Sequence, residues 1–294
     1  MAPRVVSIGD LVLDVILPVT LPVQPGGHQE SPERHVEPGG AANFMIAARR
    51  MGLGVSAAGA VGEDVFGALI LDGLRSEGVD TAFVVATPGS SSTLVIALTD
   101  RASGEHTFVG SYGTGPQVAY PHGLDACIAG ADAVFLQGYT LAEARIMPLA
   151  LRGLDHAARA GTPVFLDAGP FLAHVPPEII RRVVAGSALL LMTEDEVPLV
   201  SEGRTGEAAY AALLASGPAT LVVKRGAAGC TIITRDGALA LPGYPAQVVD
   251  TSGAGDCFDA AFVAGLLRGL PLADCGRLAN AMGVLPPAEM LMRE

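Results

Sequence analysis

The sequence has few positive charges. Its 18 Lys and Arg residues stand against 30 Asp and Glu residues, which gives a formal net charge of −12. Nucleic acids and anionic membranes attract positively charged surfaces, so this balance argues against either of them as the main partner. A phosphate ligand is not excluded, because a local site can be positive within an acidic protein. We therefore expect no nucleic-acid partner and no membrane partner.

Paired cysteines and long apolar runs are absent as well. Cys127, Cys230, Cys257 and Cys275 are scattered along the chain, with no CxxC pair and no cluster of histidines beside them. This spacing predicts free thiols in a reducing compartment. No apolar run reaches the roughly 18 residues of a membrane span. No basic segment precedes an apolar one at the start of the sequence. From these features we expect a cytoplasmic protein.

Two familiar nucleotide-binding fingerprints are missing. The sequence contains no GxxxxGK[ST] P-loop and no GxGxxG motif that opens a helix, so P-loop and dinucleotide-binding folds are not indicated. It also has no Trp, with five Tyr and nine Phe. Half of the 294 residues are hydrophobic and 16% are charged. This composition supplies an ample core for one large α/β domain or two modest ones.

The second half of the chain alternates between apolar runs typical of strands and amphipathic segments typical of helices. We expect strands at 131–138, 162–169, 187–195 and 219–226, helices at 141–161, 176–186 and 206–217, and a hairpin at 230–241. Strands separated by single helices indicate a parallel sheet with right-handed crossovers.

The first half begins with an apolar strand that leaves the core. We expect this strand at 5–19, a loop or exposed edge strand at 22–40, a helix at 41–51, a strand at 55–62, a helix at 64–79, and a strand pair at 81–88 and 92–100 that 105–113 continues. The stretches of about 11–37 and 90–112 resemble a small β excursion that could form a lid. Because no linker divides the chain, we expect a single domain, 1–294.

The segment DTSGAGDCFDAAFVAGLLRG, residues 250–269, places small residues and an acid before an apolar helix. A glycine-rich turn at a helix start leaves unpaired backbone N–H groups, which form an anion site with the helix dipole. Asp256 is poorly placed to bind an anion itself, but it could take a proton from a hydroxyl that attacks that anion. The alternative is that Asp256 only caps the helix after a tight turn.

Three further segments contain candidate ligand-binding residues. Gly39 and Gly40 form a turn before a helix in which Asn43 occupies the first turn, a pattern that suits either polyol recognition or an ordinary helix start. Asp14 interrupts an apolar strand, where it could bind vicinal hydroxyls or remain solvated at a strand end. The segment VVKRGAAGC, 222–230, places two glycines after a strand, where open α/β sheets bind ligands.

Taken together, these motifs resemble the ribokinase-like (PfkB-type) carbohydrate kinases. Residues 250–267 are similar to the family's DTxGAGD signature, and residues 39–67, GGAANFMIAARRMGLGVSAAGAVGEDVFG, are similar to its N-terminal signature. The resemblance covers nearly the whole chain. It implies an α/β fold of the ribokinase-like type, a three-layer sandwich in which helices flank a mainly parallel central sheet and a small β lid covers the sugar.

The resemblance also implies roles for individual residues. Asp256 would be the catalytic base, with Gly253, Ala254 and Gly255 forming the anion hole. The acceptor hydroxyls would be bound by Asp14, Gly39, Gly40 and Asn43. The nucleotide would lie against Lys224, Gly226, Gly229, Thr251 and Asn280. Glu196 would contribute to a magnesium site that bridges the ATP phosphates, and Asp250 and Ser252 occupy the family's monovalent-cation position.

Two segments depart from the family pattern. Residues 193–196 read TEDE, so Thr193 replaces the Asn of the family's NxxE motif while Glu196 keeps its acid. After Asn280 the chain reads AMGVLPPAEMLMRE, and Pro286 and Pro287 stand where the family closes its nucleotide and cation sites. Dependence on K⁺ therefore stays open.

The function that the resemblance implies is an ATP-dependent kinase acting on a hydroxyl of a sugar or sugar derivative. It also implies a homodimer that pairs through the exposed lid. Two alternatives remain at this point. One is a nucleoside kinase on the same fold. The other is a sugar-binding protein whose nucleotide site is impaired by the divergent C-terminal segment.

Overall fold

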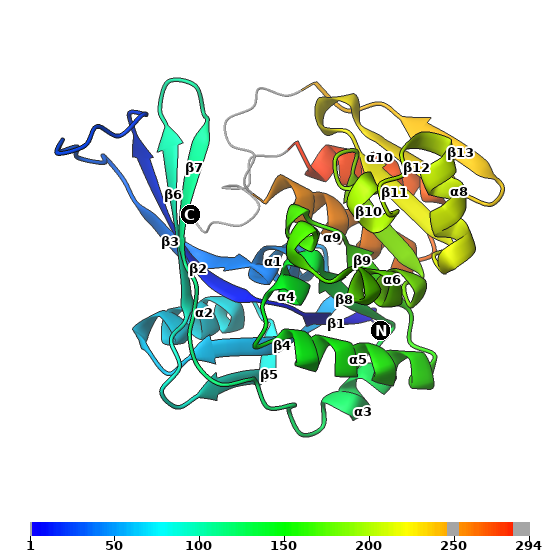
Figure 1. Ribbon diagram of the computed structural model, residues 1–294, viewed down its shortest axis with the longest axis horizontal. Helices are drawn as coiled ribbons and strands as arrows, with labels where there is room; N and C mark the ends of the chain where they lie inside the picture. Colours follow the sequence, from blue (N-terminus) through cyan, green and yellow to red (C-terminus); the bar gives the residue numbers. More distant parts are fainter. Residues whose placement is uncertain (1, 246–252, 285–294) are drawn as a thin grey trace.

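The computed structural model describes residues 2–245 and 253–284, which form one large and one small sheet with flanking helices (Figure 1). The strands are β1 (Arg4–Ile8), β2 (Leu11–Val19), β3 (His35–Gly40), β4 (Gly54–Gly62), β5 (Asp80–Thr87), β6 (Thr93–Asp100), β7 (His106–Ser111), β8 (Ala133–Gln137), β9 (Val164–Asp167), β10 (Leu189–Thr193), β11 (Thr220–Lys224), β12 (Cys230–Thr234) and β13 (Gly237–Leu241).

The helices lie mainly between successive strands of the large sheet. They are α1 (Ala41–Arg50), α2 (Val65–Ser76), α3 (Leu124–Ala129), α4 (Gly138–Ala142), α5 (Met147–Ala160), α6 (Pro177–Ala185), α7 (Val197–Val200), α8 (Gly206–Ser216), α9 (Ala254–Leu267) and α10 (Leu272–Met282), with short 3₁₀ helices η1 (Pro170–His174) and η2 (Gly226–Ala228). Within residues 2–245 and 253–284, none of these helices is long and apolar enough to cross a membrane.

The large sheet has nine strands in the order β13-β12-β11-β10-β9-β8-β1-β4-β5. The strands from β11 to β5 are all parallel to one another, and β12 and β13 form an antiparallel hairpin at one edge. Parallel neighbours need crossover connections, which the intervening helices provide. The expected mainly parallel sheet and the expected hairpin at 230–241 are both confirmed.

Helices cover both faces of this sheet, because its strands are apolar on both sides. In β8, Phe135 packs in a core with α1, α9 and α10, whereas Val134 and Leu136 pack with α3, α5, α6 and α8 on the other face. Phe44 of α1 stacks on Phe135 with ring centroids 3.5 Å apart. The expected three-layer arrangement is therefore confirmed (Figure 1).

The small sheet has four strands in the order β3-β2-β6-β7 and lies to one side of the large sheet (Figure 1). Its central pair, β2 and β6, is parallel, and both outer pairs are antiparallel. The ranges 11–37 and 90–112, which we expected to form a lid, contain β2, β6, β7 and the start of β3. That this sheet closes over a substrate remains a prediction.

The expected pairing of 81–88 with 92–100 is wrong. β5 lies at the edge of the large sheet beside β4, whereas β6 pairs with β2 and β7 in the small sheet. Between them, Gly89 adopts a left-handed conformation with φ +72°, and the chain passes there from one sheet to the other. The expected continuation of 92–100 into 105–113 is confirmed by the antiparallel pairing of β6 with β7.

Two elements that we expected to be continuous are each divided. The strand at 5–19 is split into β1 and β2, because the chain turns at Gly9 and Asp10. A Cβ at Gly9 would lie 2.1 Å from the Cβ of Ala41, so this turn packs directly on the start of α1. The helix at 141–161 is split into α4 and α5, with Pro148 in the first turn of α5, where a missing N–H is tolerated.

Candidate active site

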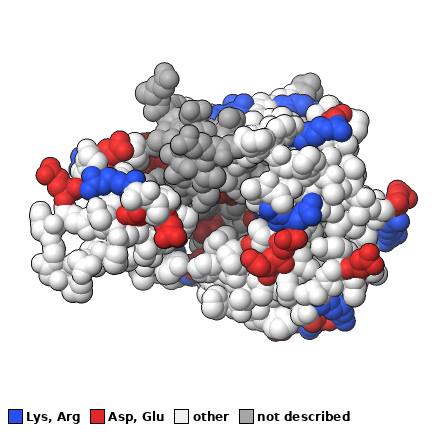
Figure 2. Space-filling view, turned by 90° about the horizontal axis from the view of Figure 1, so that it is seen from above, with Lys and Arg blue, Asp and Glu red and all other residues white. Residues whose placement is uncertain are grey.

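Five neighbouring strands of the large sheet, β11-β10-β9-β8-β1, place polar residues at one edge. Gln137, Asp167 and Lys224 end their strands, Asp10 follows β1 closely, and Glu196 follows β10. Parallel strands present their carboxyl ends at the same edge, where open α/β sheets bind ligands. From above, the molecule is hollowed between the small sheet and the main body, and acidic side chains are visible there (Figure 2).

The amino end of α9 faces this edge. Gly253 precedes the helix in a left-handed conformation with φ 75°, and among residues 2–245 and 253–284 no side chain caps the first turn. The leading N–H groups therefore lack intrahelical partners, and an anion would satisfy them. Gly255 is exposed, and a Cβ there would lie 3.8 Å from Nζ of Lys224. The expected anion hole of Gly253, Ala254 and Gly255 therefore has suitable backbone geometry, while its role stays a prediction.

Asp256 lies in the first turn of α9 with its side chain half-buried. Nε2 of Gln137 donates a hydrogen bond to Asp256 Oδ1 at 2.5 Å. Burial and the negative charge of Asp167 raise the pKa of Asp256 to about 7, against the opposing effects of Lys224 and of hydrogen bonds from Gln137 and Asn43. A carboxylate with a pKa near neutrality can exchange a proton at physiological pH, as a general base must.

Lys224 is held in a buried group of charges beside Asp256. Its Nζ lies 2.7 Å from Oδ1 of Asp167 and 3.2 Å from both carboxylate oxygens of Asp259. Burial disfavours the charged amine, but these two carboxylates raise the pKa of Lys224 above its ordinary value. Asp259 is fully buried, and burial together with Asp167 raises its pKa well above the ordinary value. The ammonium is thus engaged within the protein, and its expected contact with a nucleotide stays a prediction.

At the small sheet, Asp14 of β2 packs against Gly39 of β3. A Cβ at Gly39 would lie 1.8 Å from Oδ2 of Asp14, so a side chain there would displace the carboxylate. Gly40 has φ +60°, and its Cβ would lie 2.8 Å from the carbonyl oxygen of Asp10. Burial, then the charges of Glu37 and Asp10, raise the pKa of Asp14 to about 7. Gly39 therefore leaves the space that the Asp14 carboxylate occupies, and Gly40 lets β3 pass close to the backbone of Asp10.

We predict that Gly39→Ala lowers kcat/KM for the acceptor by roughly 10²-fold, because the added methyl group moves the Asp14 carboxylate by an ångström or more. Gly186→Ala is the matched control, since Gly186 has φ −86° and its nearest contact to an added Cβ is 3.4 Å. Initial rates at varied acceptor concentration measure the effect. Equal kcat/KM in the two variants would argue against a role for Asp14 in acceptor binding.

Asn43, in the first turn of α1, is the residue that connects the acceptor side to α9. Its side chain hydrogen-bonds with Asp256 and lowers the pKa of that carboxyl. Tyr139 of α4 is close enough to the carboxyl groups of the site to be affected by their charges: burial and then Asp167, Asp256, Glu196 and Asp10 raise its pKa to about 12. The structure thus brings Asn43 and Asp256 together, and the expected role of Asn43 in binding the acceptor stays a prediction.

Glu196, whose expected role at a magnesium site stays a prediction, follows β10 closely. Its Oε2 accepts a hydrogen bond from the backbone N–H of Thr193 at 2.8 Å, and its side chain is buried. Burial and then the charge of Asp167 raise its pKa, while Lys224 lowers it. The expected cation residues Asp250 and Ser252, and the expected nucleotide contact Thr251, lie outside the described residues.

The expected nucleotide residues after β11 form a turn. Gly226 is exposed with φ +52°, and a Cβ at Gly229 would lie 2.2 Å from the carbonyl oxygen of Leu241. Asn280 of α10 is buried, and its Nδ2 donates to the carbonyl oxygens of Pro242 at 3.0 Å and Leu241 at 3.4 Å. Gly229 and Asn280 therefore fix the end of β13 in place, and their contacts with a nucleotide stay predictions.

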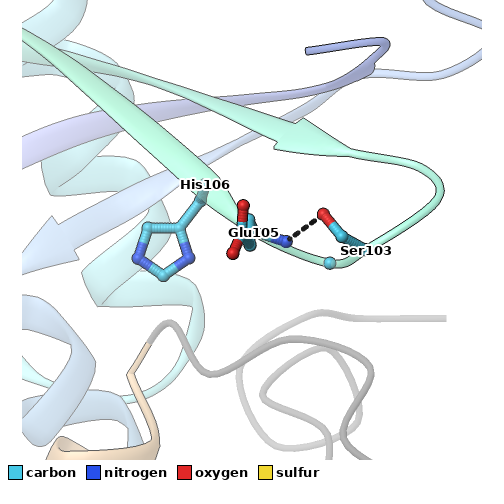
Figure 3. A pocket seen from close by; sticks show the side chains of 4 residues that line it. Ser103, Glu105 and His106 are labelled. Atoms are coloured by element: carbon cyan, nitrogen blue, oxygen red, sulfur yellow. Dashed lines mark hydrogen bonds between the residues drawn. The ribbon is translucent and has the colours of Figure 1, made fainter. Parts of the chain in front are cut away.

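A separate hollow of about 420 Å³ lies at the turn between β6 and β7, lined by Ser103, Gly104, Glu105 and His106 (Figure 3). Ser103 Oγ accepts a hydrogen bond from the Glu105 backbone N–H at 3.2 Å. The structure records no contact between these four residues and the carboxylates around Asp256. One hairpin turn supplies the whole lining of the hollow. We assign no chemistry to it.

Several residues at the site were not among the expected ones. They are Asp10, Gln137, Tyr139, Asp167 and Asp259. Gln137 and Asp167 could have been found, because each is the polar residue that ends an apolar strand, in VFLQG and VFLDAG. Asp259 gave no such signal, since it lies within the apolar run of α9.

Comparison with known proteins agrees with the family resemblance that the sequence motifs indicate, over nearly the whole chain. Residues 2–285 match the family model described as pfkB family carbohydrate kinase. Fructokinase-1 of Oryza sativa subsp. japonica is 30% identical over 304 residues, which cover 96% of this chain and 90% of that protein.

Solved structures show the same fold. A structure of Arabidopsis thaliana ribokinase complexed with ribose and ATP has a TM-score of 0.80 at 22% identity and covers 100% of both chains. A putative ribokinase II from E. coli, in complex with ATP and Mg²⁺, has a TM-score of 0.79 at 22% identity, with 99% of this chain and 94% of that chain covered. The expected ribokinase-like fold is therefore confirmed.

Proposed function

The chain belongs to the pfkB family of carbohydrate kinases, and we propose that it transfers the γ-phosphoryl group of ATP to a hydroxyl of a sugar or sugar derivative, with Asp256 as general base. The observation that carries this proposal is the position of the Asp256 carboxylate in the first turn of α9, where the described part of the chain places no capping side chain. A proton acceptor and the N–H groups of a helix start thereby lie side by side. Phosphoryl transfer needs both.

In the proposed reaction, the oxygen of the acceptor hydroxyl forms a bond to the γ-phosphorus, and Asp256 accepts the proton that this hydroxyl loses. The bond from that phosphorus to the β,γ-bridging oxygen breaks, and ADP leaves with the electron pair. The backbone N–H groups of Ala254, Gly255 and Asp256 stabilise the charge on the migrating group. Asp14, Gly39, Gly40 and Asn43 hold the acceptor hydroxyls. The residues proposed to bind the nucleotide are Lys224, Gly226, Gly229, Thr251 and Asn280.

The residues at the site are compatible with Mg²⁺ delivered with ATP. Within residues 2–245 and 253–284, no three His, Cys, Asp or Glu side chains are grouped to hold a metal by themselves. Mg²⁺ in kinases usually keeps several waters and takes one or two carboxylates plus substrate phosphates. Glu196, close to Asp167, fits that demand. A bound Mg²⁺ would neutralise phosphate charge. A K⁺ site at Asp250 and Ser252 is part of the proposal, tested by assaying with and without K⁺.

The test is an ADP-release assay over pentoses, hexoses, deoxy-keto acids, hexose phosphates and nucleosides, with mass spectrometry of the product. We expect ADP release and a phosphorylated product with at least one sugar or sugar derivative. Release with nucleosides alone would support the nucleoside-kinase alternative. Sugar binding in a calorimeter with no ADP release from any acceptor would overturn the proposal in favour of a binding protein.

We also propose that the protein is a homodimer that pairs through the small sheet. In the sheet formed by the described residues, β7 is an edge strand whose side chains are almost all exposed, including Phe108 at 54% and Val109 at 55%. Exposed apolar residues on an unpaired edge favour association with another chain. The proposed partner is the small sheet of a second copy of this chain, because a homodimer needs no other protein.

We predict that wild-type protein runs as a dimer in size-exclusion chromatography with light scattering, and that Phe108→Asp with Val109→Asp makes it monomeric. Two buried charges in place of apolar contacts oppose association. Val65→Asp is the control, because Val65 is 66% exposed but lies on α2. A dimer that persists in the double variant, or a monomeric wild type, would refute this interface.

We propose a cytoplasmic location and no nucleic-acid partner. Cys127, Cys230, Cys257 and Cys275 are all free, as expected in a reducing compartment. The net charge of −12 disfavours binding to polyanions.

A further inference from the structure

We propose that Gln137 is a positioning residue for the general base: its amide fixes the Asp256 carboxylate and favours the ionised form, although Gln137 itself takes no part in the transfer. This inference rests on the proposed function of Asp256. It concerns a residue that neither the sequence motifs nor the nucleotide and acceptor sites include. Its basis is the hydrogen bond from Gln137 Nε2 to Asp256 Oδ1.

The backbone of Gln137 is held rigidly. It is the last residue of β8, which pairs with β1 on one side and β9 on the other, and its own register partner is Asp167. The next residue, Gly138, packs so closely that a Cβ would lie 1.6 Å from the carbonyl oxygen of Ala168. The side chain of Gln137 therefore starts from a fixed point in the centre of the sheet.

The direction of the side chain follows from strand geometry. Residues two apart on a strand point to the same face, so Gln137 shares the face of Phe135, which packs on α1 and α9. Gln137 is 5% exposed and lies at the end of the apolar layer between β8 and the helices α1 and α9. Its amide is a polar group in this layer that hydrogen-bonds to Asp256. Because an ionised carboxylate only accepts hydrogen bonds, the amide must present its NH₂ group to it.

The charges around Asp256 make this hydrogen bond important. The negative charge of Asp167 of β9 raises the pKa of Asp256, and the positive charge of Lys224 of β11 lowers it. Asp259 of α9 is a further carboxyl group bound to the same Lys224. Burial, then the charges of Asp167 and Asp256, raise the pKa of Tyr139 of α4 to about 12, so its hydroxyl stays protonated over the pH range of the test below. Gln137 and Asn43 are the uncharged donors that favour the ionised form of Asp256.

Loss of the Gln137 donor should therefore raise the pKa of Asp256. A general base works only when deprotonated, so activity falls as the pH drops through its pKa. For the wild type, this places the acid limb of kcat/KM near pH 7. A hydrogen bond to a charged group contributes enough to shift that limb upward by roughly one pH unit when it is removed.

The experiment compares the pH profiles of wild type, Gln137→Met and Gln137→Glu. Methionine keeps the shape and removes the donor, and we expect its acid limb about one unit higher. Glutamate places a second carboxylate against Asp256, and we expect a larger upward shift. The matched control is Thr162→Val, which removes a buried hydrogen bond, to the Ile128 carbonyl oxygen at 3.0 Å, at the opposite edge of the sheet. Its acid limb should stay at the wild-type pH.

Two further readouts separate this role from others. The ¹³C-carboxyl resonance of Asp256, identified by its absence in Asp256→Asn, reports the pKa directly even if no acceptor is found, so a failure of the proposed function does not hide the result. Calorimetry reports acceptor affinity, which we expect to be unchanged in Gln137→Met. An unchanged Asp256 pKa in Gln137→Met would overturn the proposal, as would weakened acceptor binding with an unmoved acid limb, which would make Gln137 an acceptor ligand.

Discussion

Replacing Asp256 by Asn is expected to lower kcat by about 10²–10⁴-fold, the usual contribution of a general base. Asparagine keeps the size of the side chain and can still meet Gln137, but its amide cannot take the hydroxyl proton. Acceptor affinity, measured by calorimetry, should survive, because Asp14 and the glycines of β3 are untouched. The effect would therefore fall on turnover and not on binding.

The matched control for this substitution is Asp236→Asn. Asp236 is an exposed acid in the turn between β12 and β13, so its replacement removes the same charge far from α9. We expect its kcat to equal that of the wild type. If Asp256→Asn retains turnover comparable to Asp236→Asn, Asp256 is not the base and the proton must go elsewhere.

Replacing Lys224 by Met is expected to lower the free energy of unfolding by about 3–5 kcal/mol, the usual result of removing one partner from a buried charge group. The carboxylates of Asp167 and Asp259 would be left together in the interior without the ammonium that lies 2.7 and 3.2 Å from them. Both can escape only by binding protons. Urea unfolding followed by circular dichroism measures the change.

Arg277→Met provides the control, because Arg277 pairs with Asp274 while more than half of both side chains is exposed. Such a surface pair contributes at most about 1 kcal/mol. If Lys224→Met is as stable as this control but its KM for ATP rises strongly, Lys224 acts as a nucleotide ligand and not as the centre of the buried charges. The same two measurements therefore decide between the two roles.

The sequence was sufficient to predict the alternation of strands and helices from β8 to β11 and the place of Asp256 at the start of an apolar helix. The strands β8 to β11 are apolar on both faces and alternate with amphipathic helices. This pattern leaves few possible topologies for the sheet. The start of α9 at Gly253 is likewise a local feature, since a glycine turn and the following helix are adjacent in the chain. Local signals of this kind survive folding unchanged.

Other features depend on contacts between distant segments and could not be predicted. Asp259 lies within an apolar helix, and only the arrival of Lys224 from β11 explains an acid there. Gln137 and Asp256 are 119 residues apart in sequence, so no local pattern relates them. The wrong pairing of 81–88 with 92–100 has the same origin: both segments are good strands, and the sheet that each joins is decided by residues elsewhere.

The most direct test of the central claim is a crystal structure with the preferred acceptor and a non-hydrolysable ATP analogue. We predict that one acceptor hydroxyl lies about 2.6–3.2 Å from the Asp256 carboxylate. The terminal phosphate should face the N–H groups at the start of α9. A structure in which the hydroxyl binds away from Asp256, or the terminal phosphate binds away from α9, would contradict the proposed mechanism.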